Sequence, residues 1–287
     1  MDTFGHIWTQ RFNSSKLFYI IYYMNILELF SGTRSVGKCC DALGWDSVSV
    51  DMILPADHKV DIMEFDYKQY PKNHFDIIWA SPPCTQYSYL LNCWLGRNKN
   101  GKIYTKEIME EDMKEADKLV LKTLEIIKYF KPYYWFIENP RGRLKDRPFM
   151  KPLDFYLVDY CKYCNWGYKK TTCIWTNKKD WNALRCNNDC VNMMDNQHIK
   201  VLGNGYEMID GKKVLCNTKE KRQQLHKVRM GTSKTIKDDD KIIRCNTAEL
   251  RKKYKNYKNI NKSVNNDTTL HDRYRIPEDL IYSLFLE

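Results

Sequence analysis

The sequence predicts an α/β fold built around a mostly parallel β-sheet. Between residues 25 and 140, short apolar runs of strand length alternate with longer segments of helical periodicity. Several of the short runs stop at glycine, aspartate or proline, residues that commonly end a strand. Because 43% of the 287 residues are hydrophobic, the chain can also bury a sizeable core. Strands separated by helices usually pair in parallel through right-handed crossovers.

The first expected elements lie close together in the chain. Residues 25–30 form an apolar run that ends in Ser-Gly, and residues 33–43 follow with a helical pattern that Gly44 closes. A second strand is expected over residues 46–50. A third is expected over residues 75–80, where two prolines soon follow.

The alternation then continues before the pattern changes. Residues 107–129 have long helical periodicity, and residues 133–137 form a strand that leads into Glu-Asn-Pro. Residues 153–160 and 171–176 are interpreted as two further strands that pair antiparallel.

These patterns divide the chain into four segments. Residues 1–23 are interpreted as an N-terminal extension, since a methionine stands directly before the first strand, and residues 24–177 form the main domain. Residues 178–266 are rich in asparagine and lysine and are predicted to form a small irregular lobe. Residues 267–287 regain helical character, with Pro277 at a helix start, and are predicted to return to the main domain.

The charge is concentrated in one part of the predicted lobe. Residues 212–258 hold 16 lysines and arginines against 5 acidic residues, which accounts for the whole net charge of +11. Localised positive charge suits a nucleic acid partner. The alternative interpretation is a solvated basic tail.

Two further features indicate the environment of the protein. The chain has no apolar run of 18 residues, so we expect no membrane helix, and residues 17–23 are too short to span a bilayer and lack a cleavage signal. Eleven cysteines are an odd count in a chain too large to need a disulfide framework. We therefore expect reduced thiols and an intracellular location.

The first strand is followed by a turn that can approach a ligand. Phe30-Ser31-Gly32-Thr33 places a glycine between a strand and a helix, whose N-terminus offers N–H groups. Asp51 lies 19 residues after Gly32, at the end of the next strand, where a carboxylate can bind ribose hydroxyls. Both features suit any adenosine-containing cofactor, although the spacing is not that of a strict dinucleotide motif. The alternative is an ordinary turn.

Asp61 and Ile62 precede a short helical stretch. They could meet the edge of an adenine ring, or Asp61 could simply cap the helix.

The third and fourth strands deliver a thiol and a carboxyl group to the same edge of the sheet. Ser81-Pro82-Pro83-Cys84 follows one strand, and the two prolines fix the turn that presents Cys84. A cysteine thiolate is a suitable nucleophile for an electron-poor ring carbon. Glu138 follows the neighbouring strand and can act as a general acid toward a ring nitrogen. The alternatives are a buried structural thiol and a surface glutamate.

In their order along the chain, Phe-Ser-Gly, the acid at 51, Ser-Pro-Pro-Cys and Glu-Asn-Pro resemble four motifs of the DNA cytosine C5 methyltransferases, in particular the shorter virus- or phage-type members. The resemblance implies a Rossmann-like S-adenosylmethionine-dependent methyltransferase fold with a small target-recognition lobe. It also implies that the main domain is catalytic. Double-stranded DNA is the implied partner, with the protein acting as a monomer.

The resemblance also assigns roles to residues. Cys84 would be the nucleophile and Glu138 the carboxylate at the target cytosine, which flips out of the duplex under a closing loop, residues 85–101, that contains Ser88. In place of the family's Gln-x-Arg-x-Arg segment, residues 168–175 put Lys170 and Thr172 at the two arginine positions. The S-adenosylmethionine site would be lined by Phe30, Ser31, Gly32, Thr33, Asp51, Met52, Asp61, Ile62, Ser81 and Pro82.

Other functions remain open at this point. The same chemistry could act on RNA, or the fold could serve as a non-catalytic nucleic acid binder, given the altered Lys170 and Thr172 positions. A nicotinamide oxidoreductase is a more distant hypothesis. A group of cysteines with His198 nearby also allows a structural zinc site as an alternative to unligated thiols, its candidate ligands being Cys161, Cys164, Cys186 and Cys190, with Cys173 close in sequence.

Overall fold

The structure is a computed structural model, and it describes the chain in several ranges. These are residues 23–166, 168–194, 197–198, 206–209, 212–215, 234–238, 241–245 and 274–286. The predicted N-terminal extension, apart from Tyr23, and most of the basic segment 212–258 lie outside the described residues.

A six-stranded sheet forms the centre of the fold, in the order β2-β1-β3-β6-β8-β7. Its strands are β1 (Asn25–Leu29), β2 (Asp46–Val50), β3 (Ile77–Ala80), β6 (Tyr134–Pro140), β7 (Phe155–Asp159) and β8 (Thr171–Thr176). Strands β2, β1, β3 and β6 run parallel, and β8 is antiparallel to both β6 and β7. The prediction of a mostly parallel sheet that ends in an antiparallel pair is confirmed.

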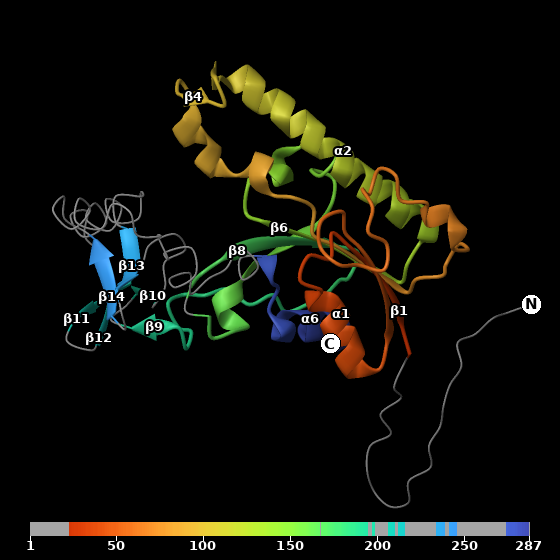
Figure 1. Ribbon diagram of the computed structural model, residues 1–287. Coiled ribbons are helices and arrows are strands. Elements are labelled where there is room, and N and C mark those ends of the chain that lie inside the picture. Colours follow the sequence, from red (N-terminus) through yellow and green to blue (C-terminus); the bar gives the residue numbers. More distant parts are fainter. Residues whose placement is uncertain are drawn as a thin grey trace, which may run out of the picture. The chain divides into compact units, whose positions relative to one another are not determined.

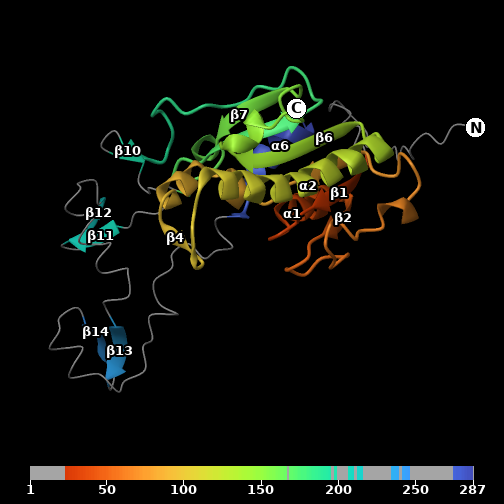
Figure 2. The same ribbon diagram turned by 90° about the horizontal axis from the view of Figure 1, so that it is seen from above.

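Helices cover both faces of the sheet (Figure 1). Helix α2 (Lys106–Phe130) spans one face, as Figure 2 shows from above, and α1 (Ser35–Leu43) lies with α6 (Glu278–Leu286) on the other. The side chains of β1 alternate accordingly, since Leu27 and Leu29 belong to the core cluster that contains α2, whereas Glu28 points to α1.

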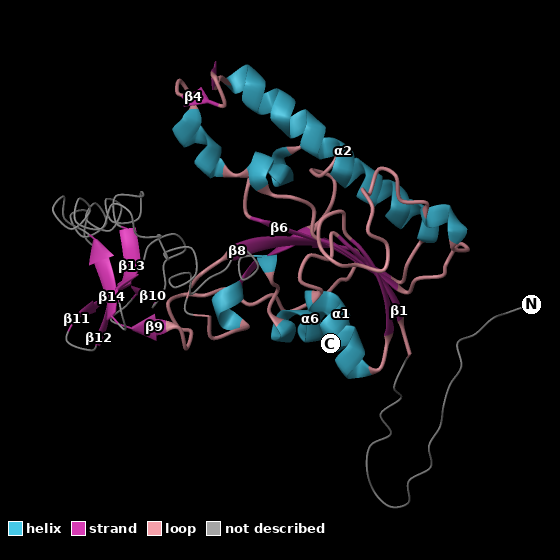
Figure 3. Cartoon of the chain, viewed as in Figure 1, coloured by secondary structure: helices cyan, strands magenta, loops and turns pink. Residues whose placement is uncertain are grey.

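The last helix, α6, packs onto the sheet and α1. Phe285 of α6 lies against Trp79 of β3 and Phe136 of β6, with ring centroids 6.3 and 5.9 Å apart. The backbone N–H of Ile276, just before α6, donates to the hydroxyl of Ser35 at the start of α1. The layering of helices on the sheet is also visible in Figure 3.

Two element boundaries differ from the sequence prediction in a way that affects the site. Helix α1 begins at Ser35 and not at residue 33, because the preceding residues form a tight turn. Strand β6 continues to Pro140 and not to residue 137. Its parallel partner β3 ends at Ala80, but the antiparallel partner β8 supplies pairing as far as Pro140, so Glu138 lies inside the strand.

Short elements complete the described chain. The 3-10 helices are η1 (Tyr67–Gln69), η2 (Thr85–Tyr87), η3 (Tyr89–Trp94), η4 (Arg143–Asp146) and η5 (Tyr160–Lys162), and a small hairpin is formed by β4 (Asn98–Lys99) and β5 (Lys102–Ile103). Within residues 178–266, the described backbone forms three antiparallel hairpins, namely β9 (Met193–Met194) with β10 (Gln197–His198), β11 (Tyr206–Ile209) with β12 (Lys212–Leu215), and β13 (Lys234–Asp238) with β14 (Lys241–Cys245). The boundaries predicted for the lobe stay a prediction.

None of the described helices combines the length and the apolar character that crossing a bilayer requires.

Candidate active site

The turn between β1 and α1 has an unusual backbone. Phe30, Gly32 and Arg34 have φ angles of 57°, 51° and 54°, in the left-handed region that side chains disfavour. A non-glycine residue in this region persists only where the surrounding structure holds it, and such residues cluster at functional sites. The buried hydroxyl of Ser31 has no hydrogen-bond partner among the described residues. This turn is therefore a candidate ligand site.

Asp51 fastens this turn to the segment after β2. Its Oδ2 accepts a hydrogen bond from the N–H of Gly32 at 2.9 Å. Its Oδ1 accepts from the N–H groups of Ile53 and Leu54 at 2.8 and 2.7 Å. The sequence predicts a carboxylate that binds a ribose, and in the structure the same carboxylate also organises the loops on either side.

Glu28 is a buried residue that sequence reasoning missed. It lies within β1, and its carboxylate accepts hydrogen bonds from the N–H groups of Val36 at 3.2 Å and Gly37 at 2.9 Å. These N–H groups belong to the first turn of α1, where the sequence predicts donors that are open to a ligand. Burial raises the pKa of Glu28 to about 7, although the two N–H donors oppose the shift. The sequence feature that could have identified Glu28 is an acidic residue in the middle of an otherwise apolar strand.

The remaining predicted cofactor residues fall into different environments. Met52 is exposed beside Asp51, and Thr33 lies in the turn, with its hydroxyl 3.1 Å from that of Ser35. Asp61 accepts a hydrogen bond from the N–H of Met63. The residues that follow it form a turn and not the predicted helical stretch, so Asp61 stabilises a turn and caps no helix. Ile62 is buried in the hydrophobic core cluster, so its side chain is part of the packing.

Ser81 and Pro82 lead from β3 to Cys84. The N–H of Ser81 donates to the carbonyl of Leu29 at the end of β1, which brings this segment next to the β1 turn. The carbonyl of Pro82 accepts a hydrogen bond at 2.9 Å from the side chain of Asn139, which is fully buried in β6. The thiol-bearing segment and the end of β6 are thus tied together.

Cys84 stands at the start of η2, directly after the two prolines. Burial raises the pKa of its thiol, and the negative charge of Glu138 raises it further. The positive charge of Lys170 acts in the opposite direction. The charges of the predicted carboxylate and ammonium groups therefore both act on the predicted thiol.

Glu138 is buried and has two partners on the same oxygen. The hydroxyl of Tyr160 donates to its Oε1 at 2.8 Å, and the Nζ of Lys170 lies 3.6 Å from the same atom. Lys170 also lies over the ring of Tyr160, with Nζ 4.5 Å from the centroid. Tyr160 was not among the predicted residues, because a tyrosine 22 positions away carries no local signal of this contact.

Thr172 has a different environment from Lys170. It is fully buried in β8, opposite Pro140 of β6, and its hydroxyl has no hydrogen-bond partner among the described residues. Lys170 precedes β8 and contacts Glu138 directly. Of the two residues at the predicted arginine positions, Lys170 is thus the one that the structure joins to the carboxylate.

The segment after Cys84 is anchored at two points. Tyr87 is buried, and its hydroxyl donates at 3.0 Å to Asp117 of α2, which also binds Arg147. Further along, Arg143 donates to the carbonyl of Ser88 at 2.6 Å and to Oδ1 of Asn92 at 2.5 Å. The predicted closing loop is therefore held by α2 and by the residues that follow β6.

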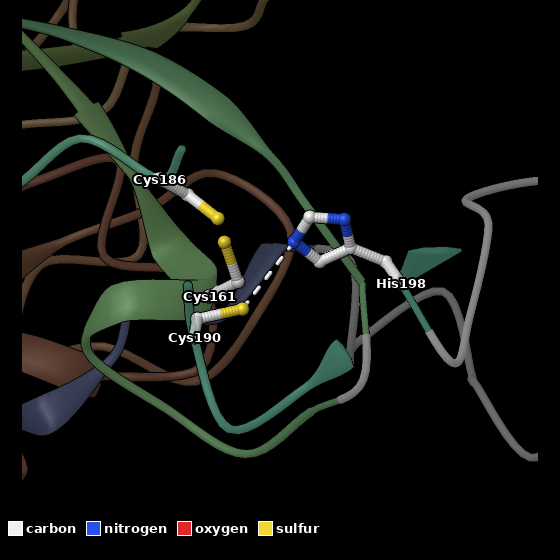
Figure 4. Close-up of side chains that lie close together, drawn as sticks. All are labelled: Cys161, Cys186, Cys190 and His198. Atoms are coloured by element: carbon white, nitrogen blue, oxygen red, sulfur yellow. Dashed lines mark hydrogen bonds between the residues drawn. The ribbon is translucent and has the colours of Figure 1, made fainter. Parts of the chain in front are cut away.

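The predicted zinc ligands are only partly brought together. The ligand atoms of Cys161, Cys186, Cys190 and His198 lie within 4.8 Å of one another (Figure 4). Cys164 is outside this group, and its thiol donates to the carbonyl of Tyr160 at 3.1 Å. Cys173 is also outside it, because its side chain points into the hydrophobic core from β8.

Comparisons with known proteins identify relatives of the chain. The profile of the family described as C-5 cytosine-specific DNA methylase matches residues 51–148. A protein of Frog virus 3 (isolate Goorha), described as "Probable DNA (cytosine-5)-methyltransferase", is 39% identical over 179 residues, which cover 60% of this chain and 80% of that protein.

Two solved structures are also similar. A prophage-encoded protein of E. coli, described as "putative DNA modification methyltransferase", has 14% identity and a TM-score of 0.38, with coverage of 53% of this chain and 46% of that one. The Dnmt2 methyltransferase of S. pombe has 12% identity and a TM-score of 0.31, with coverage of 53% and 48%. In both cases the chain spans about half the length of the solved protein.

Proposed function

This chain belongs to the C-5 cytosine-specific DNA methylase family, and on that premise we propose that it transfers a methyl group from S-adenosylmethionine to C5 of cytosine in double-stranded DNA. The observation that carries the proposal is geometric: β3 and β6 are neighbouring parallel strands, and the hydrogen bond from Asn139 to the carbonyl of Pro82 ties the segment that presents Cys84 to the strand that holds the buried Glu138.

The β1 turn has the features that S-adenosylmethionine would need. Ser31 offers a buried hydroxyl with no partner among the described residues, and Gly32 has no side chain where a ligand would approach. Met52 presents exposed apolar surface beside the Asp51 carboxylate, suited to a base and a ribose respectively. Bound there, S-adenosylmethionine would supply an electrophilic methyl group close to the end of β3.

The residues at the strand ends would act on the flipped cytosine. The Cys84 thiolate forms a bond to C6, which displaces an electron pair toward N3, and Glu138 donates a proton to N3. Tyr160 and Lys170 both contact Oε1 of Glu138, so Oε2 is the oxygen that we propose faces the base.

The covalent adduct would make C5 nucleophilic, and C5 would take the methyl group while the donor leaves as a neutral thioether. Transfer of the C5 proton to solvent would restore the ring double bond and expel the Cys84 thiolate. Return of the N3 proton to Glu138 would then regenerate the site. Lys170 offsets the effect of burial on the thiol pKa and so favours the thiolate that begins the reaction.

The other predicted parts take supporting roles. Ser88, whose carbonyl Arg143 holds, would lie against the DNA when the loop closes. The predicted lobe, residues 178–266, would read the target sequence, and its basic segment would contact phosphates. We propose that the protein acts as a monomer.

The Cys84→Ala variant tests the proposal. We expect it to transfer no tritiated methyl group to duplex DNA, because the covalent adduct cannot form, and still to bind S-adenosylmethionine by calorimetry. The matched control is Cys93→Ala, which removes an exposed thiol on the same loop and should leave transfer unchanged. Methyl transfer by Cys84→Ala at the rate of the unmodified protein would reject the mechanism.

The nature of the nucleic acid needs a separate measurement. Methyl incorporation into duplex DNA and into transfer RNA should be compared at equal substrate concentration, and we expect it in DNA. Bisulfite sequencing of DNA from cells that express the chain then locates the modified cytosines. Incorporation confined to RNA would keep the cysteine chemistry and overturn the DNA assignment.

A further inference from the structure

A cluster of three thiols and one imidazole has no role in the proposed methyl transfer. Cys161 belongs to η5, Cys186 and Cys190 follow β8, and His198 belongs to β10. Figure 4 shows the three sulfur atoms and one ring nitrogen of His198 facing a common space. Cys161 and Cys186 are buried, and Cys190 and His198 are half-buried.

The spacing of these atoms matches a tetrahedral ion. Zinc lies about 2.3 Å from cysteine sulfur and about 2.0–2.1 Å from histidine nitrogen, so tetrahedral geometry puts a sulfur and a nitrogen ligand about 3.5 Å apart. The Sγ of Cys190 lies 3.4 Å from Nε2 of His198. All four ligand atoms lie within 4.8 Å of one another, so a small shift would bring them to zinc-binding distances.

The chemistry of the donors selects the metal. Three thiolates and one imidazole are soft or borderline ligands, which favour zinc over magnesium or calcium. Four protein ligands fill a tetrahedral site, so no position is left for water or substrate, as in structural zinc sites. We propose that Cys161, Cys186, Cys190 and His198 bind one structural Zn²⁺ ion.

The neighbouring residues hold two of the ligands in place. Asp159 is fully buried, and its Oδ2 accepts hydrogen bonds from the N–H of Cys186 and from Nε of Arg185, both at 2.9 Å. The hydroxyl of Tyr163 accepts from the N–H of Leu184 at 2.8 Å. The chain that carries Cys186 is thus fixed to the end of β7 and to η5, where Cys161 lies.

The position of η5 gives the ion a consequence for the proposed active site. Tyr160 directly precedes Cys161, and its hydroxyl donates to Glu138. An ion that fixes Cys161 therefore also fixes the residue that contacts the carboxylate. The zinc is a positioning element for Tyr160 and takes no part in methyl transfer.

The first test measures metal content. The full chain, produced with zinc in the medium and dialysed extensively, should contain one zinc per chain by mass spectrometry of the metal. Cys186→Ser and His198→Ala should lose most of it. The matched control is Cys164→Ser, because Cys164 lies three residues from Cys161 but outside the cluster, and it should keep the full zinc content.

The second test does not depend on whether the variants fold. Cobalt added to the metal-free full chain should produce the intense absorption of thiolate-to-cobalt charge transfer, and zinc should displace it. Cys190 should resist alkylation until a chelator is added, whereas the exposed Cys93 should react throughout. Protein without zinc above the buffer blank, no thiolate band with cobalt, or equal zinc loss in Cys164→Ser would each overturn the proposal.

Discussion

At the scale of single residues, two opposite charges act in opposite directions on the pKa of the Cys84 thiol. Burial and Glu138 raise its pKa, and Lys170 lowers it. Because only the thiolate attacks an electrophile, the reaction of Cys84 with iodoacetamide reports this balance. In Lys170→Met the thiol pKa should rise further, so alkylation at pH 8 should slow severalfold. In Glu138→Gln the pKa should fall, and alkylation should accelerate.

The exposed Cys93 provides an internal control for this experiment. Peptide mass spectrometry can follow both cysteines in one sample, and the alkylation rate of Cys93 should stay the same in both variants. A Lys170→Met variant whose Cys84 reacts as fast as in the unmodified protein would show that the ammonium group does not act on the thiol.

At the scale of elements, the sequence predicted the features that depend on residues adjacent in the chain. Short apolar runs located the strands, and two prolines marked where the chain leaves β3 for Cys84. It could not predict that Glu28 caps α1 or that Tyr160 contacts Glu138, since these contacts depend on how separate elements pack. The extension of β6 to Pro140 likewise required knowledge of its antiparallel partner β8.

Gly142 is another element-scale feature that only the structure reveals. Its φ of −155° is open to any residue, but a Cβ there would lie 2.5 Å from the carbonyl oxygen of Tyr87, so the two backbones exclude a side chain. Gly142→Ala should therefore displace the η2 segment that follows Cys84. We expect methyl transfer to fall at least about tenfold, which corresponds to about 1.4 kcal/mol in the barrier, with cofactor binding retained.

Gly96→Ala is the matched control for this substitution. Gly96 lies in the predicted closing loop, as Tyr87 does, whereas Gly142 follows β6. A Cβ at Gly96 would meet no atom within 4 Å, although its φ of 74° disfavours a side chain. This variant should stay close to the unmodified protein in steady-state methyl transfer. If both alanine variants lose activity equally, a general disturbance of the loop, and not the contact with Tyr87, would be the cause.

At the scale of the whole molecule, Glu28 links folding stability to pH. Its pKa is about 7 in the folded protein against an ordinary value of 4.5, so the folded state binds the proton more tightly than the unfolded state does. The stabilisation from protonated Glu28 is fully present below pH 4.5 and is lost as the pH rises to about 7. A shift of this size corresponds to roughly 3 kcal/mol across that window.

Glu28→Gln separates this titration from the capping role of the side chain. Glutamine cannot ionise. Its side chain has one acceptor oxygen in place of two, so it cannot accept both hydrogen bonds that the carboxylate accepts from the N–H groups of Val36 and Gly37. The variant should therefore be about 1 kcal/mol less stable than the unmodified protein at pH 5, where Glu28 is largely protonated, and its stability should lack the decrease between pH 5 and pH 8. Urea unfolding at both pH values measures the difference.

The exposed Glu64 supplies the comparison, since Glu64→Gln should keep the pH dependence of the unmodified protein. The informative quantity is the change in unfolding free energy between pH 5 and pH 8, because other carboxylates contribute equally to all three proteins. If Glu28→Gln shows the same change as Glu64→Gln, burial of Glu28 does not couple protonation to folding. A smaller change in Glu28→Gln alone would assign the coupling to this one carboxylate, which joins the first strand of the sheet to the helix that covers it.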